Sequence, residues 1–123
     1  MLSDRQRGWV QDILDNAGAI RRHLDHLAHS DFDTFCNNEL VVDAVERCLS
    51  RISEAAVRLG EAAEEQVPGV PWDEIRGLGN QLRHAYHVID LGIVWEILVE
   101  DLYPMEEACR RALALEDDGG NVA

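Results

Sequence analysis

Two segments of the chain repeat apolar residues at helical spacing, and this pattern limits the fold more than any other feature. Within each segment successive apolar residues lie three and four positions apart, which places them on one face of an α-helix. The two sets are Val10, Ile13, Ala17, Ile20, Leu24 and Leu27, and Val42, Val45, Leu49, Ile52, Ala56 and Leu59. We predict a helix from about Asp4 to about Ala28 and a second one ending near Gly60, packed as an antiparallel pair.

The remaining chain continues in helices and loops, because no segment alternates between apolar and polar residues at period two. Residues 30–35 predict a turn or a short helical corner. Residues 61–71, which are acidic and then rich in proline and glycine, predict a loop. Three further helices are expected: one over 72–86, one that begins after Asp90 as N-cap, and one from Pro104 to about Leu115.

The predicted fold class is therefore all-α, an up-and-down antiparallel bundle of four to five helices. The 123 residues are enough for one domain, which we place over 1–116. Residues 117–123, with two acidic residues and two glycines, are expected to form an acidic flexible tail.

No apolar run is long enough for a membrane span, and the polar N-terminus lacks the apolar segment of a secretory signal. The three cysteines form no Cys-x-x-Cys pair, which indicates reduced, core-facing thiols in a cytoplasm. We therefore expect a cytoplasmic protein without a membrane partner.

The formal net charge is −13, and all eleven basic side chains are arginine. Such an excess of negative charge argues against a general nucleic-acid coat protein. Residues 1–30 and 72–87 carry as many arginines as carboxylates, and the rest of the chain carries the whole acidic excess. We predict that any anion-binding surface belongs to these two segments. Arginine suits bidentate phosphate contacts, although codon bias explains the lack of lysine equally well.

The helix predicted over 72–86 has two contrasting faces. Its apolar arc holds Ile75, Leu78, Leu82, Ala85 and Tyr86, and its opposite arc holds Arg76, Asn80, Arg83, His84 and His87. The polar arc has no carboxylate to neutralise it. It is either a solvated helix face or a surface that handles phosphate, with histidine to move protons and arginine to stabilise charge. Tyr86, on the apolar arc, would by pattern alone be a core tyrosine.

The stretch from Trp72 to Trp95 resembles the signature of the HepT-like family, within the HEPN superfamily. Its matching residues are Trp72, Ile75, Gly77, Asn80, His84, Tyr86, Asp90, Ile93, Val94 and Trp95. The run Arg51–Ala56 also resembles the second helix of that family. The resemblance implies a helical bundle that dimerises, with an active site near the dimer axis that combines arginine and histidine.

The resemblance further implies metal-independent endoribonuclease activity on RNA, without a cofactor or DNA as substrate. The implied partner is a minimal nucleotidyltransferase antitoxin, which silences such a toxin by transferring AMP to the motif tyrosine. By position, His84 is then the catalytic candidate, and Tyr86 is the candidate site of modification.

One position departs from the family pattern. The family has an arginine directly before the motif asparagine, and this chain has Gly79 there. Arg76 lies eight residues before His84, about 12 Å along a straight helix, so the two do not easily share one phosphate within a subunit. Arg76 could act across a two-fold axis, or Arg83 could substitute. Otherwise the chain is an inactive module that only binds a nucleotidyltransferase or a nucleotide.

This reading leads us to expect that Gly79→Arg would restore or raise cleavage. A different interpretation starts from His23, His26 and His29, which recur at every third residue and could hold a metal. Successive steps of three residues drift by about 60° around a helix, so a solvated face is favoured and no metal site is expected.

Overall fold

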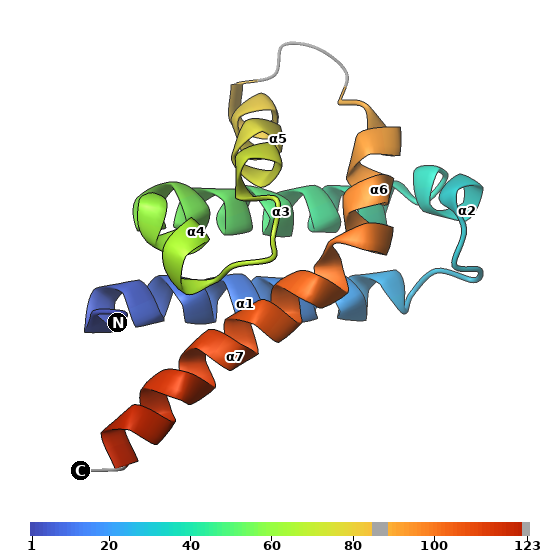
Figure 1. Cartoon of the computed structure of the whole chain (residues 1–123). Coiled ribbons are helices and arrows are strands. Elements are labelled where there is room, and N and C mark those ends of the chain that lie inside the picture. Colours follow the sequence, from blue (N-terminus) through green and yellow to red (C-terminus); the bar gives the residue numbers. More distant parts are fainter. Residues whose placement is uncertain (85–88, 122–123) are drawn as a thin grey trace.

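The structure of the protein is a computed structural model, which describes residues 1–84 and 89–121. This described part folds into seven α-helices and contains no strand (Figure 1). In chain order the helices are α1 (Asp4–Leu24), α2 (Phe32–Cys36), α3 (Glu39–Leu59), α4 (Glu61–Gln66), α5 (Trp72–His84), α6 (Leu91–Glu100) and α7 (Leu102–Asn121). The predicted all-α class is confirmed, with more helices than the four to five expected.

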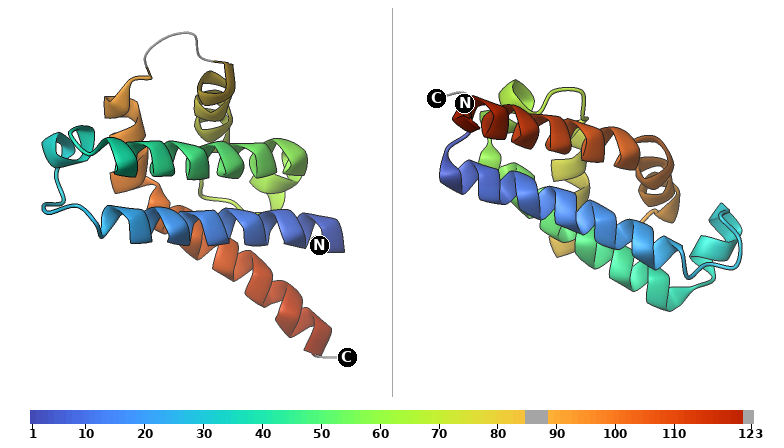
Figure 2. Two further views of the ribbon diagram at one scale, coloured as in Figure 1. Left: turned by 180° about the vertical axis from the view of Figure 1, so that it is seen from behind. Right: turned by 90° about the horizontal axis from the view of Figure 1, so that it is seen from below.

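Helices α1 and α3 form the antiparallel pair on which the other helices pack. Figure 2 shows them side by side, with α5 on α3 and with α7 crossing α1. The predicted apolar repeats face this core, because Val10, Ile13 and Ala17 of α1 and Val45 and Ile52 of α3 are fully buried. The long helices thus hold together by burying their apolar faces against each other.

The helix ends follow local capping chemistry. At the start of α1, the Ser3 hydroxyl accepts a hydrogen bond from the Gln6 backbone N–H at 3.1 Å, and the Gln6 side chain accepts one from the Ser3 N–H at 2.9 Å. Asp90 caps α6 by accepting from the Gly92 N–H at 2.8 Å, as predicted. Pro104 lies in the first turn of α7, where a missing N–H costs nothing.

Three predicted boundaries are wrong. Helix α1 ends at Leu24 rather than near Ala28, because the next backbone hydrogen bonds tighten to three-residue spacing. The segment predicted as a loop begins with α4, in which strong helix formers follow a break at Gly60, where φ is +57°. Helix α7 starts at Leu102 and continues to Asn121, beyond the end expected near Leu115.

The cysteines are free thiols, as predicted. Cys48 and Cys109 are buried and Cys36 is half-buried. Burial raises the pKa of the Cys109 thiol to about 12 and also raises the pKa of Cys48. Within residues 1–84 and 89–121, no helix is both long and apolar enough to cross a membrane.

A buried carboxylate joins α7 to α1. The side chain of Glu106 is only 1% exposed and pairs with the guanidinium of Arg21 on α1 through both oxygens. Arg110, one turn further along α7, donates a third hydrogen bond to the same carboxylate at 3.2 Å. Because a buried charge requires such partners, the bonds from Arg21 fix how α7 crosses α1.

We predict that Glu106→Gln lowers the free energy of unfolding by about 1–3 kcal/mol, because it removes two charge-assisted interactions from a buried site. Urea denaturation measures the change. The matched control is Glu107→Gln, since Glu107 also bonds Arg110, at 3.0 Å, but is 41% exposed. The control should change stability by about 0.5 kcal/mol at most. Equal effects of the two changes would contradict the role assigned to Glu106.

Candidate active site

Helix α5, which carries the predicted site, lies unusually close to α3. Gly79 is buried, and a Cβ atom built on it would lie 2.0 Å from the Cβ atom of Ser53 and 1.8 Å from its hydroxyl oxygen. Ser53 is itself fully buried, and its hydroxyl donates to the backbone oxygen of Arg76 at 3.4 Å. Only glycine fits at position 79 in this packing.

Arg76 anchors α5 to the end of α3. Its guanidinium donates to the backbone oxygen of Ala56 at 3.2 Å and to that of Gly60 at 2.9 Å, which are carbonyls at the C-terminal end of α3. It also makes two hydrogen bonds with Glu64 of α4, at 2.6 and 3.0 Å, and one with Asp73 at 3.2 Å.

These contacts correct the prediction that no carboxylate neutralises the polar face. The hydrogen bonds that Arg76 donates to Glu64 raise the pKa of Arg76, and the same contact lowers the pKa of Glu64. With its side chain 20% exposed and its donors occupied, Arg76 has a structural role and is a poor candidate for contact with a substrate.

The side chain of Arg83 extends toward Gly79, next to the space that a side chain at position 79 would fill. Its Nη1 atom lies 3.1 Å from the position that a Cβ atom of Gly79 would occupy. The same Nη1 donates a long hydrogen bond of 3.4 Å to the hydroxyl of Ser53. The residue is nevertheless exposed, and the described part of the chain offers it no carboxylate partner. Its positive charge therefore remains available at the surface.

His84 and Asn80 both lie on the solvent side of α5, one turn apart, and both are exposed. The structure therefore places His84, Asn80 and Arg83 on one accessible surface at the C-terminal end of α5, and it sets Arg76 apart from them. Tyr86 and His87, which were also predicted to belong to this region, lie outside the described residues.

The alternative of a metal site at the histidines of α1 gains no support from the geometry. Among residues 1–84 and 89–121, no group of three or more histidine, cysteine or carboxylate side chains is placed to hold a metal ion. Helix α1 ends at Leu24, so His26 and His29 follow it and do not share one helical face with His23.

Comparison with known proteins decides the family. The family described as "Ribonuclease HepT-like" matches residues 13–112. The chain belongs to this HepT-like ribonuclease family. A protein named "Putative RNase MJ1380" from Methanocaldococcus jannaschii is 34% identical over 96 residues, covering 78% of this chain and 85% of the relative.

Other relatives carry similar names. "Putative RNase MJ0125" from the same organism is 36% identical over 90 residues, covering 73% of this chain and 75% of the relative. "Probable ribonuclease HepT" from Thermococcus cleftensis is 26% identical over 96 residues, covering 78% of this chain and 84% of the relative. No solved structure gives a significant match.

Because the chain belongs to this family, the packing around Gly79 bears on the absence of the motif arginine. The motif suggested that Gly79→Arg would raise cleavage, but a side chain there collides with Ser53 and must displace α5 from α3. We therefore no longer expect that rescue in this HepT-like chain. The collision could not be predicted from the sequence, because Ser53 is 26 residues away and only the packed fold brings the two together.

The sequence also missed a row of arginines on α3. Arg47, Arg51 and Arg58 are exposed and lie within about 40° of one another around the helix. They belong to a segment that we dismissed because its summed charge is negative. Their spacing of four and seven residues could have revealed them, because it places the three arginines on one helical face even though the net charge of the segment is negative.

We predict that Gly79→Ala lowers the free energy of unfolding by about 2 kcal/mol, because overpacking against Ser53 outweighs the better helix propensity of alanine. The matched control is Gly77→Ala in the same helix, where an added Cβ meets nothing within 4 Å. The control should stabilise the protein by up to about 1 kcal/mol. Urea denaturation distinguishes the two, and a stabilising Gly79→Ala would refute the close contact.

Proposed function

We propose that the protein is a metal-independent endoribonuclease whose active site is built from His84, Arg83 and Asn80. The observation that carries the proposal is the position of Arg83. Its guanidinium covers the backbone of Gly79, the position at which the family motif has an arginine. Arg83 thus supplies a cation on the same helix as the motif residues Asn80 and His84, even though the motif arginine is absent.

In the proposed reaction, His84 takes the proton from a ribose 2′-hydroxyl as the 2′-oxygen attacks the adjacent phosphorus. The bond to the 5′-oxygen breaks, and that oxygen takes up a proton. The products are a 2′,3′-cyclic phosphate and a 5′-hydroxyl end. Arg83 stabilises the negative charge that develops on the phosphate oxygens, and the amide of Asn80 binds the phosphate or orients the imidazole.

Arg76 has no part in this proposal. The motif left open a contact of Arg76 with a shared phosphate across a two-fold axis. Its five hydrogen bonds within the described chain, to α3, α4 and Asp73, occupy the donors that such a contact requires.

We further propose that the protein acts as the toxin of a toxin–antitoxin pair, as a homodimer. Its partner is a minimal nucleotidyltransferase that silences it by transferring AMP to Tyr86. The support is the family match together with the motif around His84 and Tyr86.

A second candidate function is favoured by Gly79 itself. The missing motif arginine fits a catalytically inactive module that binds only the nucleotidyltransferase or a nucleotide. A ribonuclease assay on the free protein decides between the two functions, because the inactive module leaves RNA intact.

We predict that purified wild-type protein cleaves single-stranded RNA in the presence of EDTA and leaves 5′-hydroxyl ends. His84→Ala should lower the rate by about 10²–10⁴-fold, and Arg83→Gln by about 10²–10³-fold. Cleavage of a labelled oligonucleotide on gels, with mapping of the product ends, measures both effects.

The matched controls for this assay are His26→Ala and Arg111→Gln, which remove the same side chains at exposed positions outside the proposed site. Both should cleave at the wild-type rate. An Arg83→Gln protein that cleaves as fast as the Arg111→Gln protein would exclude Arg83 from the site. An intact RNA substrate with the wild-type protein would leave only the binding module.

We predict that the partner nucleotidyltransferase, supplied with ATP, transfers one adenylyl group to the Tyr86 hydroxyl of the wild-type protein with release of pyrophosphate. This transfer should abolish cleavage. Tyr86→Phe should gain no mass and remain active, because it lacks the hydroxyl acceptor. Tyr103→Phe is the control, since Tyr103 is exposed and should not alter the transfer. Intact-mass spectrometry reads the result, and addition of AMP to Tyr86→Phe would contradict the assignment.

A further inference from the structure

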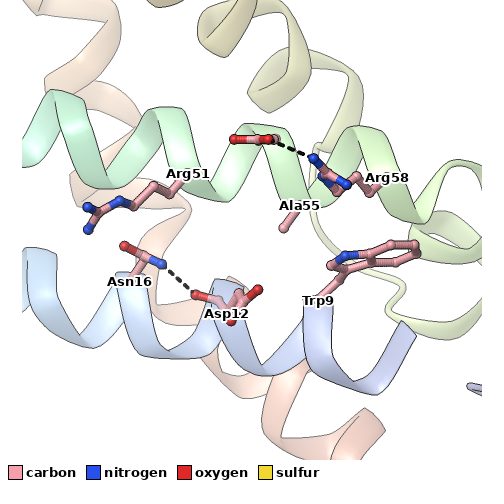
Figure 3. Close-up of a pocket in the computed structure, with 7 residues that line it drawn as sticks. Trp9, Asp12, Asn16, Arg51, Ala55 and Arg58 are labelled. Carbon is pink, nitrogen blue, oxygen red and sulfur yellow. Dashed lines mark hydrogen bonds and ion pairs between the residues drawn. The ribbon is translucent and has the colours of Figure 1, made fainter. Parts of the chain in front are cut away.

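A polar groove runs between α1 and α3, on a surface that the proposed chemistry does not use. Its volume is about 480 Å³, within the range of small-ligand sites. Figure 3 shows α1 and α3 contributing side chains from opposite sides. Its lining residues are Trp9, Asp12 and Asn16 of α1 and Arg51, Glu54, Ala55 and Arg58 of α3.

The two arginines of the groove are available to an anion. Arg51 is exposed, and within the described residues its side chain makes no hydrogen bond or ion pair. Within the described residues Arg58 pairs only with Glu54, at 3.1 Å, and both side chains are 56% exposed. An exposed pair of this kind contributes little stability, so Arg58 can exchange it for a phosphate.

Trp9 supplies an aromatic surface at the same place. It is half-buried, packs partly on the core and lines the groove with its indole ring. Figure 3 shows the ring beside Arg58, with Ala55 facing it from α3. An indole held in this way can stack on a nucleobase, and stacking accepts any base. Asp12 and Glu54 can accept hydrogen bonds from the amino groups of bases.

The groove continues toward the candidate active site. A second hollow of about 350 Å³ is lined by Glu54, Val57, Arg58 and Arg83. It shares Glu54 and Arg58 with the groove and ends at Arg83, the cation of the proposed site. A strand that places a phosphate at Arg83 can therefore follow α3 past Arg58 to the groove and Arg51.

We propose that this groove is a subsite for single-stranded RNA. A base of the substrate stacks on Trp9, and the neighbouring phosphates contact Arg51 and Arg58. The inference rests on the proposed function, because it takes the strand to be the one cleaved at His84. The subsite adds one requirement to those of the cleavage site: the RNA substrate must carry an unpaired nucleotide at a distance from the bond that is cleaved.

The test uses a fluorescent RNA oligonucleotide of about twelve nucleotides, 2′-O-methylated so that it cannot be cleaved. Fluorescence anisotropy gives the Kd at several salt concentrations. Trp9→Leu should weaken binding by about tenfold, which corresponds to the loss of one stacked base. Arg51→Gln should reduce the slope of log Kd against log salt by about 0.7, as for one lost phosphate contact to a single strand.

Arg111→Gln is the matched control for charge, because Arg111 is exposed on α7 outside the groove. It should leave the salt slope unchanged. Arg51→Gln tests the subsite even if Trp9→Leu loses stability, since Arg51 is exposed. A duplex of the same sequence should bind more weakly and respond little to Trp9→Leu, because its bases are already stacked.

The outcomes separate the subsite from the cleavage chemistry. Weakened binding by Trp9→Leu and Arg51→Gln supports the subsite even if the wild-type protein cleaves nothing, in which case only the proposed function fails. If both variants bind as the Arg111→Gln protein does, the subsite is overturned, whether or not cleavage occurs. A wild-type protein that binds no RNA overturns both.

Discussion

The close contact between Gly79 and Ser53 is the constraint on which the rest of the site depends. Without a side chain at position 79, α5 approaches α3 until the backbone of one helix meets a buried hydroxyl of the other. Arg76 then reaches the carbonyls at the end of α3, and Arg83 extends over the glycine. One missing side chain thus determines both the packing of α5 and the position of the Arg83 guanidinium.

The arginines of this acidic chain differ in their partners. Arg21 joins α7 to α1 through Glu106, Arg76 joins α5 to α4 through Glu64, and Arg110 binds Glu106 within α7. Arg51 and Arg83 have no carboxylate partner within the described residues, and both line surfaces on or next to α3. A chain of strongly negative net charge can therefore present a local anion-binding surface, because the field near a phosphate depends on the nearest charges.

Much of the fold was predictable, because apolar residues at helical spacing in α1 and α3 leave few alternatives. The caps at Ser3 and Asp90 also follow from local chemistry. The short helix α4 was missed, since the chain around it resembles a loop and only Gly60 marks the break. Of the site, His84 and Asn80 were placed on an exposed face correctly.

The role of Arg76 could not be predicted. Its partner Glu64 is twelve residues away, on a helix that the sequence did not predict. The contact between Gly79 and Ser53 was hidden for a different reason, because it joins two helices that were predicted but whose packing against each other was not. Periodicity shows which face a residue occupies within its own helix, but it does not show which residue of another helix that face meets.

The central claim is that Arg83 supplies the positive charge that the motif arginine would otherwise provide. Chemical rescue tests it most directly: Arg83→Ala is assayed for RNA cleavage with added guanidinium, far below the concentrations that unfold the protein. The account predicts that guanidinium restores part of the lost rate to Arg83→Ala and none to His84→Ala. Full activity of Arg83→Ala without any guanidinium would contradict it.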